Sequence, residues 1–282
     1  MQPPPATEGG IANSVRTELA ARCHDSVWTW SVVMEEARRS ISLPMPGPLH
    51  EARFLERPNR FIVHALLGNG RRVVAHLADP GKLRELLVPG RRLQLRRATE
   101  PSRKTQWSAA LVEAPDSSTW VSIDTGLPNR LIGRALEMGA LEELAAWDLE
   151  RGEYTVGDSR FDFLLRRRRG GRGPRRMLLE VKSVSLVEGG IGLFPDAVTA
   201  RGTRHVRELA ALRRSGDWAA AVLFVLQRPD AARIMPFAAR DPGFAQALAE
   251  ARRAGVRLLG RRCSIDLESV TLGPPIPVAL GM

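Results

Sequence analysis

Two carboxylates and one lysine in the second half of the chain have the types and spacing of a metal-dependent hydrolytic site: Asp162, Glu180 and Lys182. Glu180 and Lys182 are two residues apart in an apolar run that predicts a strand, so their side chains share one face. A hairpin would bring Asp162, on the preceding predicted strand, beside them. Carboxylates can hold Mg²⁺ or Mn²⁺, and a lysine can position or deprotonate an attacking water. We interpret the three as catalytic residues for phosphodiester hydrolysis, with Asp162 and Glu180 as metal ligands. A salt bridge at a sheet edge is the alternative.

The scarcity of lysine supports a chemical role for Lys182. The chain has 42 basic residues, and only Lys82, Lys104 and Lys182 are lysines. A bias toward arginine should spare lysine where a compact ammonium that can shift its pKa is needed, because a guanidinium cannot replace it there. Chance survival of any one lysine is the alternative explanation.

Further polar side chains follow on a predicted helix over 198–214. Arg201 and His205 recur at helical spacing and share one face. Both could contact phosphates near the scissile bond. Asp196 precedes the helix, where it could cap the helix or reach the metal. A structural role for His205 is an equal alternative.

The elements predicted around these residues are, in order, a helix over 129–149, strands over 154–156, 160–165 and 177–185, a helix over 198–214, a strand over 219–227, a helix over 242–254 and a strand over 256–261. This order resembles the PD-(D/E)xK nuclease core, and Asp162 with Glu180-Val181-Lys182 matches its metal and lysine positions. The resemblance implies that Glu137, on the first helix, is a further metal ligand. The alternative for Glu137 is a solvated carboxylate.

The first half of the chain has a different pattern. It predicts strands over 51–57, 60–67 and 71–77, a helix over 80–87 capped by Asp79, and strands over 91–98 and 105–113. Three strands, a helix and two strands suit a small OB-like barrel, a fold that commonly binds nucleic acid, although another small β-barrel is possible. Lys82 and Arg84 would lie beside open N–H groups at the start of the helix, where a phosphate could bind. Solvated basic residues on a capped helix are the alternative.

Composition sets the limits of this interpretation. The chain has 282 residues, of which 44% are hydrophobic and 26% charged, which excludes a disordered chain, a coiled coil and collagen. No apolar run approaches the ~18 residues that cross a bilayer. The N-terminus does not resemble a secretory signal, and Cys23 and Cys263 match no metal or redox spacing, so we expect a cytoplasmic protein with no membrane partner. We predict an N-terminal extension over 1–45, partly disordered or helical, an OB-like domain over 46–115 and an α/β domain with a central mixed sheet over 116–282.

The net charge predicts a polyanionic partner. Lys and Arg outnumber Asp and Glu by 42 − 31 = 11, and the sequence pI is about 11.1. A basic surface gains free energy by releasing the counterions condensed on phosphates. An arginine-biased genome whose proteins drift basic is the alternative. Aromatic residues make up only 5% of the chain, which does not favour sequence-specific reading of single strands.

Five motifs in order resemble the sugar fermentation stimulation protein A family: His76-Leu77-Ala78-Asp79-Pro80-Gly81, Leu127-Pro128-Asn129-Arg130-Leu131, Ser159-Arg160-Phe161-Asp162-Phe163, Glu180-Val181-Lys182-Ser183-Val184, and Phe194-Pro195-Asp196-Ala197-Val198-Thr199 with Arg201-Gly202 and His205. The resemblance implies an OB-like domain before a PD-(D/E)xK nuclease-like domain, and DNA binding with a role in regulating sugar (maltose) metabolism genes. It adds Arg130 to the nucleic-acid-binding set of Lys82, Arg84, Arg201 and His205. Asp79 is a departure, because family members commonly carry Asn there.

Three functions remain in competition. The first is a DNA-binding protein, for single or double strands, with an Mg²⁺- or Mn²⁺-dependent nuclease site. The second is a non-cleaving DNA-binding regulator of sugar (maltose) metabolism genes on a nuclease-like scaffold. The third is a binder of another polyanion, such as RNA. The intact Asp162, Glu180 and Lys182 set favours the first, since a protein that only binds DNA would not need the lysine.

Overall fold

The computed structural model describes residues 41–115, 118–170 and 172–281. Residues 1–40 of the predicted extension, including Cys23, therefore lie outside the described residues. Residues 41–44 form a strand. No helix among the described residues is long and apolar enough to cross a membrane.

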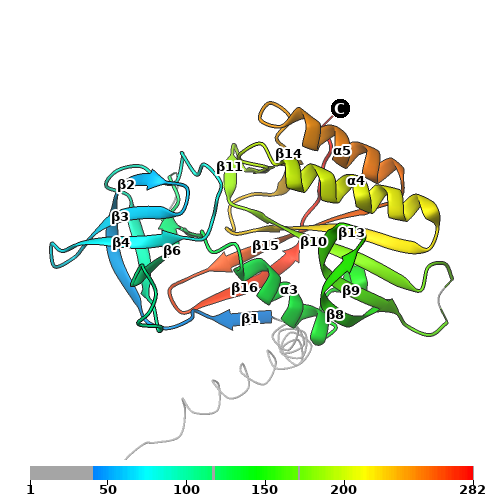
Figure 1. The fold of residues 1–282 in the computed structure, drawn as a ribbon, viewed down its shortest axis with the longest axis horizontal. Coiled ribbons are helices and arrows are strands. Elements are labelled where there is room, and N and C mark those ends of the chain that lie inside the picture. The colour runs from blue at the N-terminus through cyan, green and yellow to red at the C-terminus, as the bar shows by residue number, and fades with distance from the viewer. Residues whose placement is uncertain (1–40, 116–117, 171, 282) are drawn as a thin grey trace, which may run out of the picture. The chain divides into compact units, whose positions relative to one another are not determined.

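The first domain is the predicted OB barrel (Figure 1). Its strands are β2 (Leu49–Asn59), β3 (Ile62–Leu67), β4 (Arg72–Leu77), β5 (Arg92–Arg97) and β6 (Trp107–Glu113). Strand β2 pairs with both β3 and β5, and the parallel pairing of β4 with β6 closes the barrel. Alternate residues of each strand point into the barrel and form its core. In β4, for example, Val73, Ala75 and Leu77 are buried while their neighbours are more exposed. A short strand, β7 (Trp120–Ser122), pairs with β6, so the barrel sheet continues past the predicted boundary at residue 115.

The helix predicted over 80–87 is wrong. The segment is a loop in which Leu83 has φ 47°, a left-handed conformation that cannot continue a helix. Leu83, Leu86 and Leu87 are buried in the barrel core, and one turn, closed by Leu87 N–H donating to Leu83 O (2.8 Å), is all that forms of the predicted helix. Two of the N–H groups predicted to be open here have partners within the chain. Gly81 N–H donates to Asp79 Oδ1 (2.8 Å), and Leu83 N–H donates to Asp196 Oδ2 (3.2 Å).

The second domain is built on a seven-stranded mixed sheet with the order β1-β16-β15-β13-β10-β9-β8. Its strands are β1 (Ile41–Pro44), β8 (Trp147–Val156), β9 (Ser159–Arg167), β10 (Arg176–Val184), β13 (Trp218–Leu226), β15 (Arg257–Ile265) and β16 (Ser269–Pro275). The parallel strands β10, β13 and β15 form its centre. A smaller sheet contains β11 (Leu186–Glu188), β12 (Ile191–Phe194) and β14 (Arg233–Pro236).

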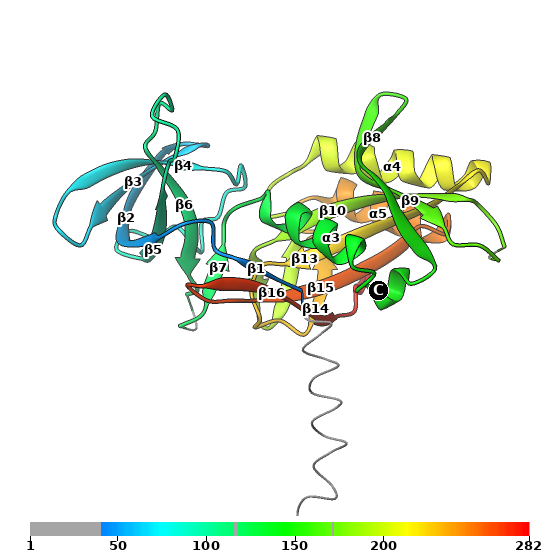
Figure 2. The ribbon, with the colours of Figure 1, turned by 90° about the horizontal axis from the view of Figure 1, so that it is seen from below.

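Helices cover both faces of the large sheet (Figures 1 and 2). On one face, α4 (Ala200–Ser215) and α5 (Pro242–Arg253) pack on the alternate residues that include Leu178 and Val222. On the other face, α3 (Leu127–Glu137) packs on the intervening residues, such as Leu179. Each residue of β10 is therefore committed to one of the two faces.

Two regions of this domain differ from the sequence prediction. The helix predicted over 129–149 ends at Glu137, because Gly139 turns the chain with φ 62°, and a 3₁₀ turn, η1 (Glu142–Leu144), leads directly into β8. The predicted last strand is followed by β16, which pairs antiparallel with β1 (Figure 1). Strand β1 precedes the barrel in sequence, yet it belongs to the sheet of the second domain.

Candidate metal-binding and hydrolytic site

Glu180 is the centre of the site. It lies on β10 on the face covered by α4, and it is only 4% exposed. Its Oε1 accepts from the Lys182 ammonium and from His205 Nδ1 (2.8 Å). Burial alone would raise the pKa of Glu180, but the hydrogen bond from His205 and the charge of Lys182 hold that pKa below its usual value. Glu180 is therefore a carboxylate, and its Oε2 is buried without a hydrogen-bond partner.

Asp162 lies beside it on β9, where the pairing of β9 with β10 stops. The last paired residues are Phe163 and Leu179, and the Asp162 carboxylate takes up the next position. Its Oδ2 accepts from Val181 N–H (2.7 Å), and its Oδ1 accepts from Asn129 Nδ2 (2.6 Å). Burial raises the pKa of Asp162, and the negative charge of Glu180 acts in the same direction.

Asn129 is a site residue that the sequence analysis does not single out. It lies in the first turn of α3, just after Pro128, and it fixes Asp162 from the opposite side of the sheet to α4. A lone Asn in a helix gives no chemical signal. Its position within one of the five family motifs was the one feature of the sequence that could have indicated a role in the site.

A divalent cation fits this pair of carboxylates. Glu180 Oε2 is buried without a partner, and the pKa of Asp162 is raised by burial and by the charge of Glu180, so a cation near both carboxylates would satisfy the oxygen and stabilise the charged form of Asp162. Within the described ranges no group of three or more His, Cys, Asp or Glu side chains is placed to hold a metal ion. The residues therefore suit a cation such as Mg²⁺, which needs only one or two carboxylates and fills its other positions with water and phosphate oxygens.

Glu137 is not part of this arrangement. It is the last residue of α3, whereas Asn129, at the site, is in the first turn, and eight residues of helix span about 12 Å. Its carboxylate is exposed and pairs with Arg134 (3.3 Å). The structure thus places Glu137 as a surface carboxylate, and its predicted role as a metal ligand is corrected.

His205 also departs from its predicted role. Its side chain is 3% exposed and faces Glu180 and the ring of Phe161, so a nucleic-acid strand cannot reach it. Because a carboxylate only accepts, the proton of the hydrogen bond lies on His205 Nδ1. His205 is therefore a positioning residue for Glu180 and not a nucleic-acid contact.

This position predicts a graded effect of two substitutions. If Asp162 and Glu180 hold Mn²⁺, His205→Ala should raise the Mn²⁺ concentration needed for half-maximal binding in a calorimetric titration by about 10- to 100-fold, because residues that orient a metal ligand contribute that much to affinity. His205→Asn keeps an N–H donor near the position of Nδ1 and should restore most of the affinity. Equal Mn²⁺ requirements of the two variants would contradict the assignment.

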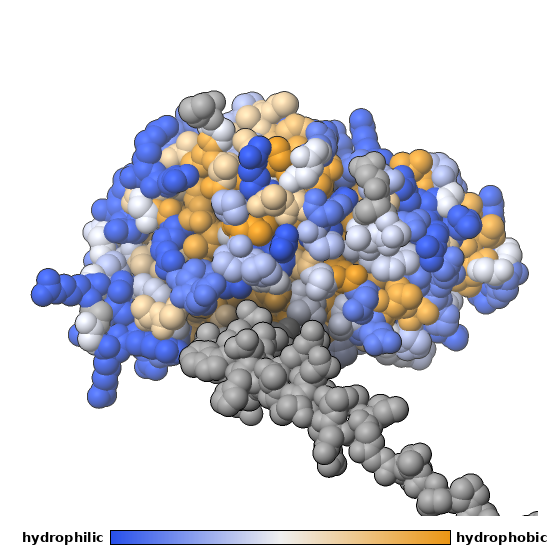
Figure 3. Space-filling view, turned by 180° about the vertical axis from the view of Figure 1, so that it is seen from behind, coloured by the Kyte–Doolittle hydropathy of each residue, from blue (hydrophilic) through white to orange (hydrophobic). Residues whose placement is uncertain are grey.

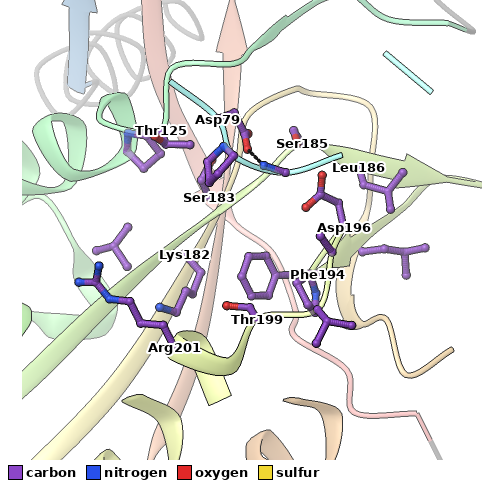
Figure 4. A pocket seen from close by; sticks show the side chains of 18 of the residues that line it. Asp79, Thr125, Lys182, Ser183, Ser185, Leu186, Phe194, Asp196, Thr199 and Arg201 are labelled. Carbon is purple, nitrogen blue, oxygen red and sulfur yellow. Dashed lines mark hydrogen bonds between the residues drawn. The ribbon is translucent and has the colours of Figure 1, made fainter. Parts of the chain in front are cut away.

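A cavity of about 660 Å³ opens beside the site, between the 79–81 loop of the barrel and the second domain (Figure 4). Lys182 and Asn129, the partners of the two carboxylates, line it, and so does Arg201 from α4. In Figure 4, Lys182 and Arg201 lie together on one side, whereas Asp79 and Asp196 lie on the other. Arg201 is thus placed to contact a substrate next to Lys182.

Asp196 neither caps α4 nor reaches the carboxylates. Thr199 is the N-cap of α4, since its side chain accepts from Gly202 N–H (3.1 Å). Asp196 instead binds the barrel loop through Leu83 N–H. It lies so close to Gly81 that a Cβ there would come within 2.3 Å of Asp196 Oδ2, which explains a glycine at this position.

Arg57 of β2 fixes the same loop from the barrel side. Its guanidinium donates to four carbonyl oxygens, those of Arg60, Asp79, Gly81 and Lys82 (2.6–3.1 Å). Burial lowers the pKa of Arg57, partly offset by the charges of Asp79 and Asp196. The wall that the barrel contributes to the cavity is therefore rigidly held.

The other predicted nucleic-acid contacts lie on the surface around the cavity. Lys82 and Arg84 are exposed on the barrel loop. Arg130, at the start of α3, is half-exposed and pairs with Asp124 (2.9 Å). The structure brings Arg201 to the cavity itself, but it does not bring these three into one cluster with Lys182.

An OB barrel joined to a mixed α/β domain, with a buried Glu180, a partly buried Asp162 and Lys182 on the neighbouring strands β9 and β10, defines a two-domain class of protein. Residues 55–123 match the family model described as the SfsA N-terminal OB domain, and residues 126–269 match that of the sugar fermentation stimulation protein RE domain. The chain belongs to the sugar fermentation stimulation protein family.

Known relatives agree over nearly their whole length. A sugar fermentation stimulation protein homolog of Moorella thermoacetica is 46% identical and matches 84% of this chain and 99% of its own. The homolog of Shouchella clausii is 42% identical and matches 83% of this chain and 98% of its own. A solved structure of Pyrococcus furiosus SfsA, in complex with Ca²⁺, has a TM-score of 0.74 and 29% identity, and covers 83% of this chain and 97% of its own.

Proposed function

We propose that the protein is a divalent-metal-dependent nuclease that acts on DNA. The observation that carries this proposal is Glu180, a buried carboxylate with one unpartnered oxygen, next to Asp162 and bound to Lys182 at the edge of a cavity. A buried carboxylate oxygen without a partner is rare in folded proteins, and ionisable groups in such surroundings gather at functional sites. Mg²⁺ or Mn²⁺ would be held by Asp162 and Glu180.

Each residue has a separate task in this proposal. A bound cation would neutralise the charge that develops on the phosphate and lower the pKa of a water. Lys182, which lines the cavity, positions the attacking water as an ammonium, or deprotonates that water once its own ammonium has given up a proton to solvent. Asn129 and Val181 N–H hold the Asp162 carboxylate, and His205 holds that of Glu180, so both ligands are fixed before substrate binds.

The electrostatics of the chain support a nucleic-acid substrate. The net charge is +11, which favours a polyanionic partner. The face shown in Figure 3 carries hydrophilic side chains interspersed with apolar ones. Arg201 would contact a phosphate beside the scissile bond, and Lys82, Arg84 and Arg130 would contact the strand farther out. RNA carries the same phosphates, so competition between RNA and DNA of equal length measures which is preferred.

The Pyrococcus furiosus relative, described in complex with Ca²⁺, adds support for a divalent cation in this chain. Ca²⁺ and Mg²⁺ are both hard cations that take oxygen ligands. Asp162 and Glu180 offer such ligands here.

Cleavage of plasmid and single-stranded DNA with Mg²⁺ or Mn²⁺ tests the proposal directly. We expect the wild-type chain to cleave and Asp162→Ala to lose cleavage at least about 100-fold, because removing a metal ligand removes the charge stabilisation of the transition state. A gel shift at matched salt should find DNA affinity within a few fold of wild type. The surface variant Glu137→Ala serves as the matched control and should cleave normally. Equal cleavage by wild type and Asp162→Ala would refute the assignment.

The alternative is a non-cleaving DNA-binding regulator of sugar (maltose) metabolism genes. It is favoured by the hydrogen bonds that both oxygens of Asp162 and one oxygen of Glu180 already accept within the chain. Binding without cleavage under either metal would support this alternative. The cavity and its basic rim would then hold DNA, with Lys182 acting as a phosphate clamp.

A further inference from the structure

Three neighbouring strands of the barrel place a polar row on its outer face. Ser108 of β6 lies directly opposite His76 of β4 and also opposite Arg96 of β5. Residues opposite each other on paired strands share a face. The flanking residues Ala75, Leu77 and Leu95 are buried in the barrel core, so the row faces outward.

Arg103, from the loop between β5 and β6, completes a pocket over this row. Its Nη1 donates to Ser108 Oγ (3.2 Å), which anchors the loop on the strands. The resulting pocket has a volume of about 240 Å³ and is lined by His76, Arg96, Arg103 and Ser108. Its size is suited to a phosphate group rather than to a whole nucleotide.

The positive charge of the pocket is not neutralised. Neither Arg96 nor Arg103 forms an ion pair with any acid among the residues that the structure describes. Asp124 also lines the pocket, but its carboxylate is taken up by Arg130 (2.9 Å) and Gly126 N–H (2.9 Å). Burial lowers the pKa of His76, the charge of Arg103 adds to this effect, and the charge of Asp124 partly opposes it, so the His76 imidazole is held as a neutral donor.

The pocket lies next to the catalytic cavity along the chain. Ala78 lines the pocket and the next residue, Asp79, lines the cavity. Likewise, Asp124 lines the pocket and Thr125 lines the cavity. Thr125 Oγ1 donates to Ala78 O (3.3 Å) and ties the two segments together. A ligand that spans both openings would therefore cross this point.

We propose that the pocket formed by His76, Arg96, Arg103 and Ser108 binds a backbone phosphate of the same strand that enters the catalytic cavity. The proposal rests on the nucleic-acid substrate proposed above. Arg96 and Arg103 supply the charge and the forked donors that suit phosphate oxygens, and Ser108 and His76 supply neutral donors. The barrel then sets which phosphate reaches Lys182, because its loop is fixed on the second domain through Leu83 and Asp196.

Strand binding by the full chain tests the proposal without cleavage. In the Asp162→Ala background, the affinity for a fluorescein-labelled 20-nucleotide single strand is measured by anisotropy at several salt concentrations. R96Q/R103Q should weaken binding roughly tenfold and reduce the slope of log affinity against log salt by about 0.7, as expected when one phosphate of a single strand is no longer neutralised. The matched control is R71Q/R72Q, which removes the same charge from exposed positions of the same barrel. An equal loss in both double variants would overturn the proposal, because it would leave only the general charge of the surface.

A titration with inorganic phosphate tests whether the pocket binds phosphate independently of a nucleic-acid strand. Titrating phosphate into the full chain should shift the ring signals of His76 in nitrogen-edited NMR spectra, and R96Q/R103Q should abolish the shift. One result would overturn the nucleic-acid strand as the ligand: phosphate shifts the His76 signals, but R96Q/R103Q leaves the affinity for the single strand unchanged. The pocket would then be a site for free phosphate. Strand binding that depends on the pocket, in a wild-type chain that cleaves no DNA, would leave this proposal standing and refute only the nuclease.

Discussion

Replacing Lys182 by alanine should lower the rate of DNA cleavage by about 10²- to 10⁴-fold, the contribution typical of a positioned proton-transfer group. The ammonium is the only positively charged group that both contacts Glu180 and lines the cavity among the described residues. DNA affinity should stay within a few fold, since one of many positive charges is lost. Cleavage rates under saturating Mn²⁺ and gel shifts at matched salt measure the two effects separately.

Two variants sharpen this test. Lys104→Ala removes an exposed lysine from the barrel and should leave the rate of cleavage unchanged. Lys182→Arg keeps a positive charge but replaces the ammonium by a guanidinium that stays protonated, so it should remain inactive if Lys182 moves a proton. Full activity of Lys182→Arg would reduce Lys182 to a source of charge. A loss of binding alone in Lys182→Ala would identify a phosphate clamp instead of a nuclease.

Asp79→Asn should stabilise the protein at neutral pH and leave it unchanged below pH 4. Burial raises the pKa of Asp79 from 3.8 to about 6, more than the hydrogen bond from Gly81 lowers it. Below pH 4 the folded and unfolded chains both hold the proton. Between pH 4 and 6 the unfolded chain loses it first, so the free energy of unfolding falls with rising pH, by about 3 kcal/mol in all at 1.4 kcal/mol per pKa unit.

The asparagine removes this loss because it keeps an oxygen for Gly81 N–H and carries no charge. Urea unfolding of wild type and variant at several pH values between 4 and 8 isolates the effect of this single group. Asp217→Asn, at an exposed carboxylate before β13, is the matched control and should follow wild type. A difference between wild type and Asp79→Asn that stays constant across the range would contradict the linkage. The family resemblance, in which Asn is common at this position, agrees with the expected direction.

The sequence predicts most of the sheet elements because alternation and apolar runs are local signals. Strands β3, β4, β5, β10 and β13 lie within a few residues of their predicted bounds. The same alternation predicts that Glu180 and Lys182 share a face, and the structure brings Asp162 beside them. Site residues that depend on one strand and its neighbour in a hairpin are therefore accessible to sequence reasoning.

The errors have a common cause, which is tertiary contact. The loop at 80–87 has the apolar spacing of a helix, but its leucines fill the barrel core and Leu83 adopts a positive φ. Glu137 lies on the predicted helix, yet periodicity does not say which end of a helix meets the sheet. The row of His76, Ser108 and Arg96 depends on register between strands that are distant in sequence, and no local pattern encodes that register.

The pairing of β1 with β16 means that the barrel is inserted into the second domain rather than placed before it. The sheet begins at residue 41, is interrupted by the whole barrel, and is resumed after it. A fragment that starts at residue 126, where the match to the second family model begins, would lack β1 and leave β16 as an open edge. Open edges invite pairing between molecules. A soluble isolated second domain should therefore carry residues 41–44 joined to residue 124 by a short flexible linker.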